Sequence, residues 1–463
     1  MSDKIIDPGS FRDPSGYVYL REGLIHRRIN DCYKDDYEQL INSGLYDKLT
    51  EQSYLVKHEE TDISSTPQTG EYKNIIPEQI PFISYPYEWS FSQLKDAALL
   101  TIDIQIQAIK YDMSLKDASA YNIQFLKSKP IFIDTLSFEK LNEGLPWVAY
   151  QQFCKHFLAP LALMSIKDIR LGQLLRVYID GIPLDMTTKL LPLKTYFSFG
   201  ILSHLHLQAM AQNRYADSDK VNHKVRTLTK TDLINICESL RRTVIKLSWS
   251  PENTEWGNYY EKNNNYSTET ILHKEKFVSD SLEKITPKLV WDLGSNTGHF
   301  SRLSSSCGFP TISFDIDPAC VEINYLESRK KNETELLPLL LDLTNPSPGI
   351  GWGNLERSAL FERKSPQLIL ALALIHHLAI SNNLPLTKIA NLFSKNAPYL
   401  VIEFVPKSDS MVKRLLSTRE DIFPDYNKEK FEEIFGRYYT ILSKENIKNS
   451  ERIIYLMKSI KVE

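Results

Sequence analysis

The residues whose types and spacing best suit ligand binding lie around residue 294. The stretch Asp292-Leu-Gly-Ser-Asn-Thr-Gly298 follows a short apolar run and precedes a helical pattern. Gly294 permits a tight turn with positive φ, and Asn296 belongs to the few other residue types that tolerate this conformation. Gly298 lets the backbone approach a ligand or lets a helix pack closely on a sheet. The chain has only 17 glycines in 463 residues, so this cluster is informative.

Two carboxylates follow this turn at the ends of the next two apolar runs. Asp315 lies in Phe314-Asp-Ile-Asp-Pro318, about 20 residues past the glycines, where a carboxylate can accept hydrogen bonds from ribose hydroxyls. Asp342, in Leu341-Asp-Leu343, is placed to take an adenine amino group. The alternative is an ordinary turn that binds nothing. The order of turn, helix and strand-end carboxylates favours a nucleoside site.

The elements that must position these residues alternate between strand and helix. Short apolar runs separated by helical patterns predict right-handed βαβ units and a parallel sheet that is covered on both faces. Two final strands over 438–442 and 452–457 would close the sheet with an antiparallel edge. The other expected strands lie at 288–292, 311–315, 337–341, 368–375 and 399–405, with helices up to 307 and over 318–330.

The turn resembles the first motif of class I S-adenosylmethionine-dependent methyltransferases, with Asn296 in place of the usual middle glycine. Phe314-Asp-Ile-Asp-Pro318 resembles their second motif, and the resemblance covers about residues 270–460. It implies an α/β, Rossmann-like domain with a mainly parallel seven-stranded sheet and S-adenosyl-L-methionine as cofactor. By this resemblance the glycines of the turn hold the methionine end of the cofactor, Asp315 holds the ribose and Asp342 holds the adenine. The implied cofactor-binding residues are Asp292, Gly294, Asn296, Gly298, Asp315 and Asp342. A nicotinamide-dinucleotide enzyme would need a GxGxxG spacing, which is absent.

Catalytic candidates follow strands four and five, at the edge that faces the transferred methyl group. Methyl transfer is an in-line displacement, so the protein must orient an acceptor and deprotonate it if it is a hydroxyl. His376 or His377 could be the general base, since a neutral imidazole is available near pH 7; alternatively both cap the strand. Glu403 could bind or polarise the acceptor. Lys407 could pair with a substrate carboxylate or phosphate, or be a solvated loop charge.

A missing motif and the net charge narrow the class of methyl acceptor. Methyltransferases that act on adenine or glutamine nitrogens carry an Asn-Pro-Pro-Tyr-like tetrapeptide after strand four, and this chain does not. This favours O-methylation, and the near-neutral net charge of −3 favours a small-molecule or glycan-type acceptor. The aromatic segment Trp256–Tyr260 could form a lid or be ordinary interdomain packing. The stretches 342–348, 371–378 and 402–407 resemble a bacterial group of methyltransferases that includes host-specific nodulation proteins.

The N-terminal half contains a second constellation. Asp117, Asn122 and Asp134 resemble, in type and spacing, the catalytic and metal-binding loops of protein-kinase-like phosphotransferases. That resemblance implies an α+β, largely helical domain, in which Asn122 and Asp134 would hold Mg²⁺ if the half is active; no other metal site is expected. A glycine-rich phosphate loop is absent from the first 100 residues, Leu115 stands where the family has His, and Lys57 is a weak counterpart of the phosphate-binding lysine. These departures favour a degenerate, non-catalytic fold; a further alternative is that the three residues only cap helices and turns.

Composition and periodicity set the domain organisation. Helical patterns dominate 92–110 and 148–164 and continue over 185–210, and polar stretches at 212–231 and 251–267 mark the boundaries. We predict a kinase-like domain over 1–220, linker or lid helices over 221–270 and the methyltransferase domain over 271–463. The first domain would control acceptor access. The alternatives are a bifunctional kinase–methyltransferase, or a docking module that binds a protein partner.

Charge and cysteine content describe an ordinary globular chain. Hydrophobic residues make up 42% and charged residues 24%, which excludes a disordered chain. Lys+Arg 55 against Asp+Glu 58 gives a net charge of −3, so no net basic field favours nucleic acid. The longest aliphatic run, 368–375, is too short to span a membrane. Five scattered cysteines without a CxxC pair suit reduced thiols, and with no apolar N-terminal leader we expect a cytoplasmic protein.

Overall fold

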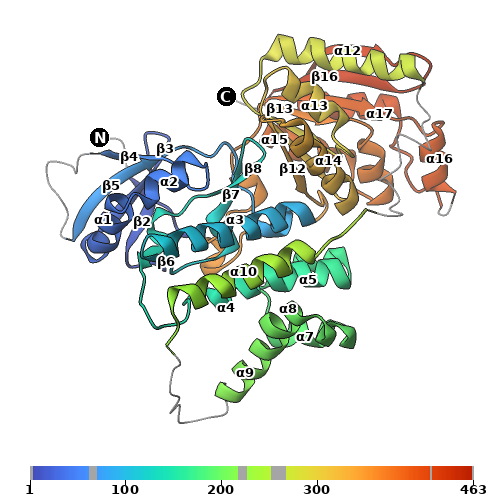
Figure 1. The fold of residues 1–463 in the computed structure, drawn as a ribbon. Coiled ribbons are helices and arrows are strands. Elements are labelled where there is room, and N and C mark those ends of the chain that lie inside the picture. The colour runs from blue at the N-terminus through green and yellow to red at the C-terminus, as the bar shows by residue number, and fades with distance from the viewer. Residues whose placement is uncertain (1–3, 62–69, 217–226, 252–266, 418–419, 461–463) are drawn as a thin grey trace. The chain divides into compact units, whose positions relative to one another are not determined.

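The chain divides into two compact units (Figure 1). The first comprises Met1–Trp249 with Pro348–Ala359, and the second Ser250–Ser347 with Leu360–Glu463. The computed structural model describes residues 4–61, 70–216, 227–251, 267–417 and 420–460, so the predicted lid at 256–260 lies outside the described residues. Residues 230–246, which the sequence pattern assigned to a linker, belong to the first unit.

The first unit begins with a five-stranded antiparallel sheet in the order β1-β2-β3-β5-β4. Its inner face packs on Tyr33 and Tyr37 through Ile29 and Ile75, all buried. Residues 16–21 form a full strand, whereas residues 53–57 contribute only an isolated bridge from Leu55 to Phe132. The strands are β1 (Ile5–Ile6), β2 (Gly16–Arg21), β3 (Leu24–Asn30), β4 (His58–Thr61) and β5 (Glu71–Pro77).

Helices make up most of the rest of this unit. The longest, α3 (Phe91–Lys110), starts with a capping box between Ser90 and Gln93 and is buried along much of its length. The predicted helix over 148–164 is interrupted by a π-helical turn at Cys154–Leu158, because Pro160 cannot donate to the carbonyl four residues before it. The other helices are α1 (Lys34–Asn42), α2 (Leu45–Glu51), α4 (Tyr150–Phe153), α5 (Ala159–Ile166), α6 (Leu174–Val177), α7 (Leu184–Leu190), α8 (Phe199–Ile201), α9 (Leu207–Ala216) and α10 (Lys230–Lys246).

Two small antiparallel pairs carry the loops of the second constellation. They pair β6 (Met113–Leu115) with β9 (Phe138–Lys140), and β7 (Ile123–Leu126) with β8 (Lys129–Phe132). Asp117 and Asn122 lie between β6 and β7, and Asp134 lies after β8. The pairing therefore brings residues from three sequence positions to one region of the first unit.

The second unit is built on a seven-stranded sheet in the order β12-β11-β10-β13-β14-β16-β15. The first five strands run parallel. As the sequence pattern predicted, two final strands close the sheet: β16 pairs antiparallel with β14, and β15 pairs antiparallel with β16. The fourth strand is shorter than predicted: it ends at Ala371, because Ala373 adopts a φ of +51° that stops extended backbone. The strands are β10 (Val290–Leu293), β11 (Thr311–Asp315), β12 (Leu336–Leu340), β13 (Leu368–Ala371), β14 (Tyr399–Phe404), β15 (Tyr439–Asn446) and β16 (Ile453–Ser459).

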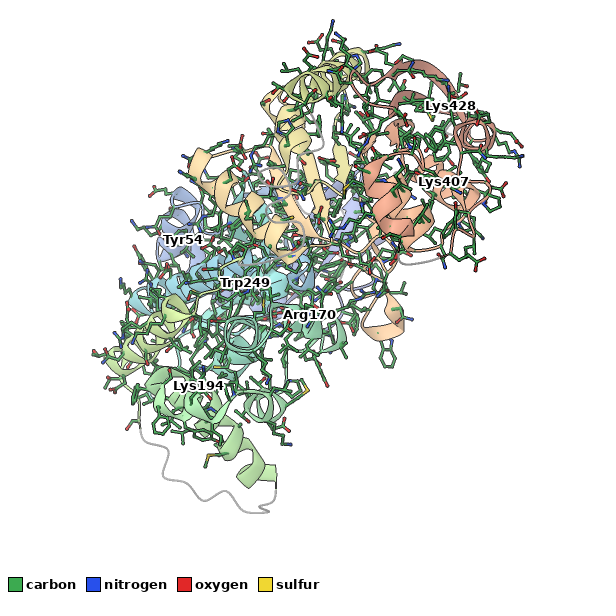
Figure 2. All side chains as sticks on the ribbon, turned by 90° about the vertical axis from the view of Figure 1, so that its right-hand side faces the viewer. Tyr54, Arg170, Lys194, Trp249, Lys407 and Lys428 are labelled. Carbon is green, nitrogen blue, oxygen red and sulfur yellow. The ribbon has the colours of Figure 1, made fainter. Side chains whose placement is uncertain are left out.

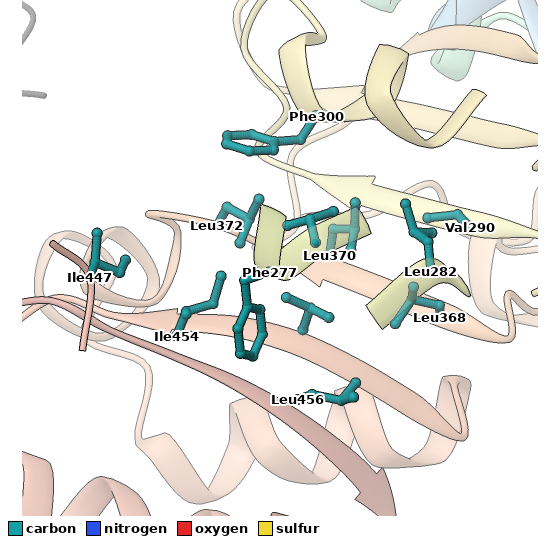
Figure 3. Close-up of a cluster of buried hydrophobic side chains, with 12 residues drawn as sticks. Phe277, Leu282, Val290, Phe300, Leu368, Leu370, Leu372, Ile447, Ile454 and Leu456 are labelled. Carbon is teal, nitrogen blue, oxygen red and sulfur yellow. The ribbon is translucent and has the colours of Figure 1, made fainter. Parts of the chain in front are cut away.

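Helices pack on this sheet and enclose an apolar core. One face of α12 meets β10, β13, β14 and β16 there (Figure 3). The helices are α12 (Thr268–Ile285), α13 (His299–Ser306), α14 (Pro318–Lys331), α15 (Leu386–Asn396), α16 (Ser410–Leu416) and α17 (Lys428–Phe435). The core residues are Phe277, Val278, Leu282, Val290, Phe300, Leu368, Leu370, Leu372, Val401, Ile447, Ile454 and Leu456.

Two expectations from the sequence concern the cysteines and membrane-spanning segments. All five cysteines are free thiols. Within the described ranges, no helix is both long and apolar enough to cross a membrane.

Candidate functional site

The glycine turn after β10 adopts the strained backbone that its residue types predict. Gly294, Asn296 and Gly298 have φ values of +72°, +52° and +84°. A Cβ on Gly298 would lie 2.5 Å from the side-chain amide of Asn324, and one on Gly294 would lie 3.0 Å from Leu374. Both glycines are therefore required by close packing as well as by φ.

Hydrogen bonds fasten this turn to the end of β11. The backbone N–H of Gly294 and that of Ser295 donate to the carbonyl of Phe314 at 2.9 and 3.0 Å. Asn296 N–H donates to Oδ2 of Asp315 at 2.7 Å, and Asp317 N–H donates to Oδ1 at 2.9 Å. The turn and the second strand-end carboxylate consequently form one rigid structure.

Asp292 and Asp315 are both buried at the carboxyl ends of adjacent parallel strands. Burial raises the pKa of Asp292 to about 7, although Ser301 donates a hydrogen bond to its Oδ2 at 2.6 Å. Burial likewise raises the pKa of Asp315 to about 6, against the backbone donors at Asp317 and Asn296. Burial makes both carboxylates costly to ionise, and both line one cavity. This combination indicates a site that binds cationic groups or hydroxyl donors.

A cavity of about 240 Å³ lies at this edge of the sheet. It brings together six of the nine predicted cofactor and catalytic residues, namely Asp292, Gly294, Asn296, Asp315, His376 and His377. Lys274 also lines the cavity, although no sequence motif indicated it, and its ammonium group lies 5.0 Å from the ring centre of Phe300. The other lining residues are Ser295, Phe300, Ile316, Leu372, Ala373, Leu374, Ser381 and Asn382.

Asp342 is at the same edge of the sheet but outside the set that lines the cavity. Its Oδ1 accepts hydrogen bonds from the backbone N–H and the hydroxyl of Thr344, at 2.8 and 2.6 Å. Such a bond pattern closes a turn locally. Gly298 also does not line the cavity; it starts α13 behind the turn.

The histidine pair lies after the short strand β13. The rings of His376 and His377 are 4.2 Å apart, and Nδ1 of the buried His376 has no hydrogen-bond partner among the described residues. Burial and the nearby charge of Arg452 together lower the pKa of His377 to about 4. Burial, with His377 and Arg452, also lowers the pKa of His376. Both imidazoles are thus neutral at pH 7.

Glu403 occupies a different position from the one expected of an acceptor-binding group. It is fully buried, accepts from Lys274 Nζ at 2.7 Å and from Arg452 at 3.2 Å, and does not line the cavity. Burial opposes its ionisation, but Lys274 and Arg452 outweigh burial and lower its pKa. Arg452 is also paired with Asp409 at 2.7 Å. Glu403 therefore holds Lys274 at the wall of the cavity.

Lys407 forms an ion pair with Asp421 at 2.7 Å and donates to the carbonyl of Phe423. Its ammonium group is therefore used within the loop that follows β14.

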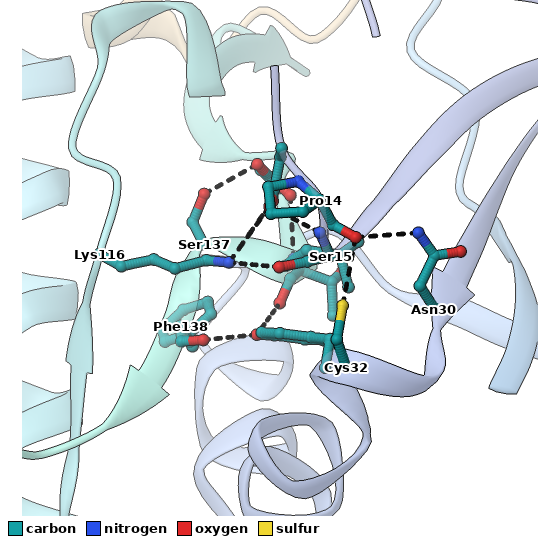
Figure 4. A network of polar contacts seen from close by, with 12 residues as sticks. Pro14, Ser15, Asn30, Cys32, Lys116, Ser137 and Phe138 are labelled. Carbon is teal, nitrogen blue, oxygen red and sulfur yellow. Dashed lines mark hydrogen bonds and ion pairs between the residues drawn. The ribbon is translucent and has the colours of Figure 1, made fainter. Parts of the chain in front are cut away.

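In the first unit, the loops of the second constellation take part in a network of polar contacts that includes Lys116 and Ser137 (Figure 4). Asn122 donates to the hydroxyl of Ser137 at 3.1 Å, and that hydroxyl donates to Asp134 at 2.8 Å. The other oxygen of Asp134 is ion-paired with Arg27 of β3. Burial lowers the pKa of Arg27 to about 10, against the attraction of Asp13.

A neighbouring contact ties the segment between β1 and β2 to the same loop. Lys116 donates to Ser15 at 2.6 Å and lies 3.4 Å from Asp13. Asp117 accepts from the N–H of Ser119 at 2.8 Å, as in a helix cap. Across the described residues, no group of three or more His, Cys, Asp or Glu side chains is placed to hold a metal ion.

The fold and the site of the second unit define an α/β ligand-binding unit whose cavity lies outside the carboxyl ends of parallel strands. No family model matches the sequence. Nodulation protein NoeA of Rhizobium meliloti (strain 1021) is 34% identical over 453 residues, which cover 96% of this chain and 94% of that protein. The chain belongs to the family of nodulation protein NoeA.

The comparison with solved structures finds matches with TM-scores near 0.3. The N-methyltransferase NodS from Bradyrhizobium japonicum WM9 is 10% identical, with 42% of this chain and 98% of that chain covered, at a TM-score of 0.30. Magnesium protoporphyrin IX methyltransferase (ChlM) from Synechocystis PCC 6803, solved with bound SAM, is 15% identical, with coverages of 43% and 88% and a TM-score of 0.29. The bifunctional kinase-methyltransferase WbdD is 14% identical, with coverages of 41% and 39% and a TM-score of 0.29.

Proposed function

We propose that the second unit binds S-adenosyl-L-methionine and transfers its methyl group to an acceptor. The observation that carries this proposal is the meeting of a strained glycine turn and two buried strand-end carboxylates in one cavity. The turn and the Asp315 segment are also the stretches that resemble the methyltransferase motifs. An empty structural turn would not need carboxylates whose ionisation is opposed by burial.

The residues of the cavity suit the two ends of such a cofactor. Asp315 is positioned to accept from ribose hydroxyls, and Asp292 to accept from the methionine amino group. Lys274 at the cavity wall supplies a positive charge for the methionine carboxylate. A side chain at Gly294 would fill the space beside Leu374. A glycine at this position therefore fits a cofactor that lies close to the backbone. Asp342 would accept from an adenine amino group through Oδ2, because its turn bonds to Thr344 use Oδ1.

The acceptor end of the cavity is formed by the histidine pair. The cofactor supplies a methyl group on a sulfonium, which transfers to a nucleophile without redox chemistry. His376 and His377 line the cavity as neutral imidazoles, which supports one of them as the group that accepts a proton from an acceptor hydroxyl. We therefore propose that the methyl group is transferred to an oxygen of a small-molecule or glycan-type acceptor. We also propose that the enzyme is cytoplasmic. Glu403 is proposed only as the residue that positions Lys274.

Calorimetry with S-adenosylhomocysteine tests this proposal. Asp315→Ala should remove cofactor binding, because the ribose loses its acceptor and the turn loses the bond to Asn296. Asp280→Ala, at an exposed position of α12, is the matched control and should bind as the unchanged protein does. Undiminished affinity in Asp315→Ala would remove the cofactor from this cavity.

A second candidate function, a phosphotransferase in the first unit, is favoured by one observation. Arg27 on β3 meets Asp134, which is linked through Ser137 to Asn122. Kinases place their phosphate-binding lysine on the third strand and hold Mg²⁺ with an Asn and an Asp. The contrary observation is that Lys116 holds the β1–β2 segment on the same loop.

Binding of ATP with Mg²⁺, lost in Asp134→Asn and kept in Asp35→Asn of α1, would support a bifunctional enzyme. No binding by the intact chain would leave the first unit as the domain that controls acceptor access or docks a protein partner.

A further inference from the structure

The first unit carries a strongly exposed apolar surface between α7 and α9. Leu193, Phe197 and Phe199 are 80%, 92% and 76% exposed, and lie within one short segment. Tyr196 and Leu207 are exposed beside them. We call these five residues the Phe197 surface. Soluble proteins bury aromatic side chains wherever they can, so a contiguous exposed group of this kind marks a contact site.

The segment that presents these side chains is firmly held from behind. Thr195 is buried between them, and its hydroxyl bonds to the carbonyl of Pro192 at 2.7 Å and to the ring of His206 at 2.9 Å. The ring of Tyr196 stacks on His206 at 3.9 Å between ring centres. A side chain at Gly200 would overlap Thr243 of α10, so α8 packs tightly on that helix. The exposure of Phe197 and Phe199 is consequently built into the fold.

The segment that carries this surface is positively charged, with one acidic residue, Asp185, at its start. Between Met186 and Ala216 the chain contains no Asp or Glu, and it contains Lys189, Lys194 and Arg214. Lys194, labelled in Figure 2, is exposed in the same segment as Leu193 and Phe197. Lys189 is exposed beside Leu190 and forms an ion pair with Asp185 at 3.5 Å. Aromatic and aliphatic tips with interleaved lysines suit the boundary between acyl chains and anionic headgroups.

We propose that the Phe197 surface docks the protein on a lipid bilayer that contains anionic lipids. The apolar tips enter the headgroup region, and Lys194 and Lys189 meet the phosphates. A second copy of the chain is a poorer occupant, because a two-fold contact would place these lysines against each other. This proposal is independent of the methyl-transfer reaction.

Cosedimentation of the full chain with sucrose-loaded vesicles tests the proposal. Vesicles of phosphatidylcholine with about a third phosphatidylserine should bind the protein, and pure phosphatidylcholine should bind it far more weakly. Raising the salt should weaken binding, because the lysine contribution is screened. Each of Lys189→Gln and Lys194→Gln should weaken binding about fivefold.

The double variant Phe197→Ser/Phe199→Ser should weaken vesicle binding at least tenfold. Leu272→Ser, an exposed leucine of α12, is the matched control and should bind like the unchanged protein. An unchanged far-ultraviolet circular dichroism spectrum and urea midpoint in all variants verify their folding. Failure of the unchanged protein to bind anionic vesicles overturns the proposal, and so does equal binding by the phenylalanine variant. A dimer in sedimentation velocity that this variant abolishes would identify a second copy as the occupant instead.

Discussion

The backbone N–H of Asn296 donates a hydrogen bond to Oδ2 of Asp315 at 2.7 Å, which joins the glycine turn to the end of the second parallel strand. Asn296 itself adopts a positive φ in this turn, a conformation that its residue type tolerates. The position of the ribose-binding candidate is therefore fixed by the turn that follows the first strand. A change in either element should disturb both.

Gly298→Ala should destabilise the second unit by about 2–3 kcal/mol, because the new Cβ combines an unfavourable φ with an overlap on Asn324. Gly308→Ala is the matched control: its φ is +85°, but nothing lies within 4 Å of the added Cβ. Strain alone should cost about 1 kcal/mol there. Urea unfolding of both variants measures the difference, and equal losses would show that Asn324 does not require the glycine.

Asp292→Asn should stabilise the cofactor-free protein at pH 8. The pKa of Asp292 is raised from 3.8 to about 7, so the folded state binds more protons than the unfolded state between these values. Stability from this group is therefore lost as pH rises through that window, by up to about 4 kcal/mol. Asparagine keeps an acceptor for Ser301. Urea unfolding at pH 5 and pH 8 should show the larger gain at pH 8; a gain independent of pH would contradict the assignment.

Cofactor binding should strengthen as pH rises from 5 to about 7. The proposed amino and hydroxyl partners prefer ionised carboxylates, and the pKa values of Asp292 and Asp315 lie near 7 and 6. Binding near pH 6.5 should therefore release protons. Calorimetry in two buffers of different ionisation enthalpy measures this release. An affinity that is flat between pH 5 and 8 would exclude these carboxylates as ligands of the cofactor.

His377 should remain neutral at pH 5.5. Burial lowers its pKa to about 4, so its ring signals in a histidine-labelled sample should not titrate between pH 5.5 and 8. His377→Gln assigns the signal. Replacing His376 and His377 together by Ala should spare binding of S-adenosylhomocysteine and stop methyl transfer. A titration midpoint near 6.5 would show that the pair is solvated.

Glu403→Gln should destabilise the protein by about 3 kcal/mol, because it leaves Lys274 and Arg452 buried with less compensating charge. Lys274→Met/Glu403→Gln should recover part of this loss, since it removes one cation with the anion. Urea unfolding of the two single variants and the double variant gives the coupling energy. Additive losses would mean that Lys274 and Glu403 do not interact.

Much of the second unit could be predicted from the sequence, because its parallel strands are buried on both faces and appear as short apolar runs between helical patterns. Asp292 and Asp315 end neighbouring strands, so their meeting in one cavity follows from the topology. The early end of β13 was not predictable from residue types, since it depends on a positive φ at Ala373, a residue that rarely adopts one.

The other contacts that could not be predicted from the sequence join residues far apart along the chain. Lys274 and Arg452 stand 129 and 49 positions from Glu403, so no local pattern could show that its charge is already paired. Arg27 is separated from Asp134 by 107 positions, and an arginine in a strand carries no signal of its own. In both cases the tertiary fold decides which buried charges meet, while sequence spacing reveals only short-range neighbours.

A crystal structure of the chain soaked with S-adenosylhomocysteine tests the central claim most directly. We predict density for the ligand in the cavity, with its ribose at Asp315 and its amino-acid end between Asp292, Gly294 and Lys274. Ligand density at any other site, or a cavity left without ligand at saturating concentration, would contradict the assignment.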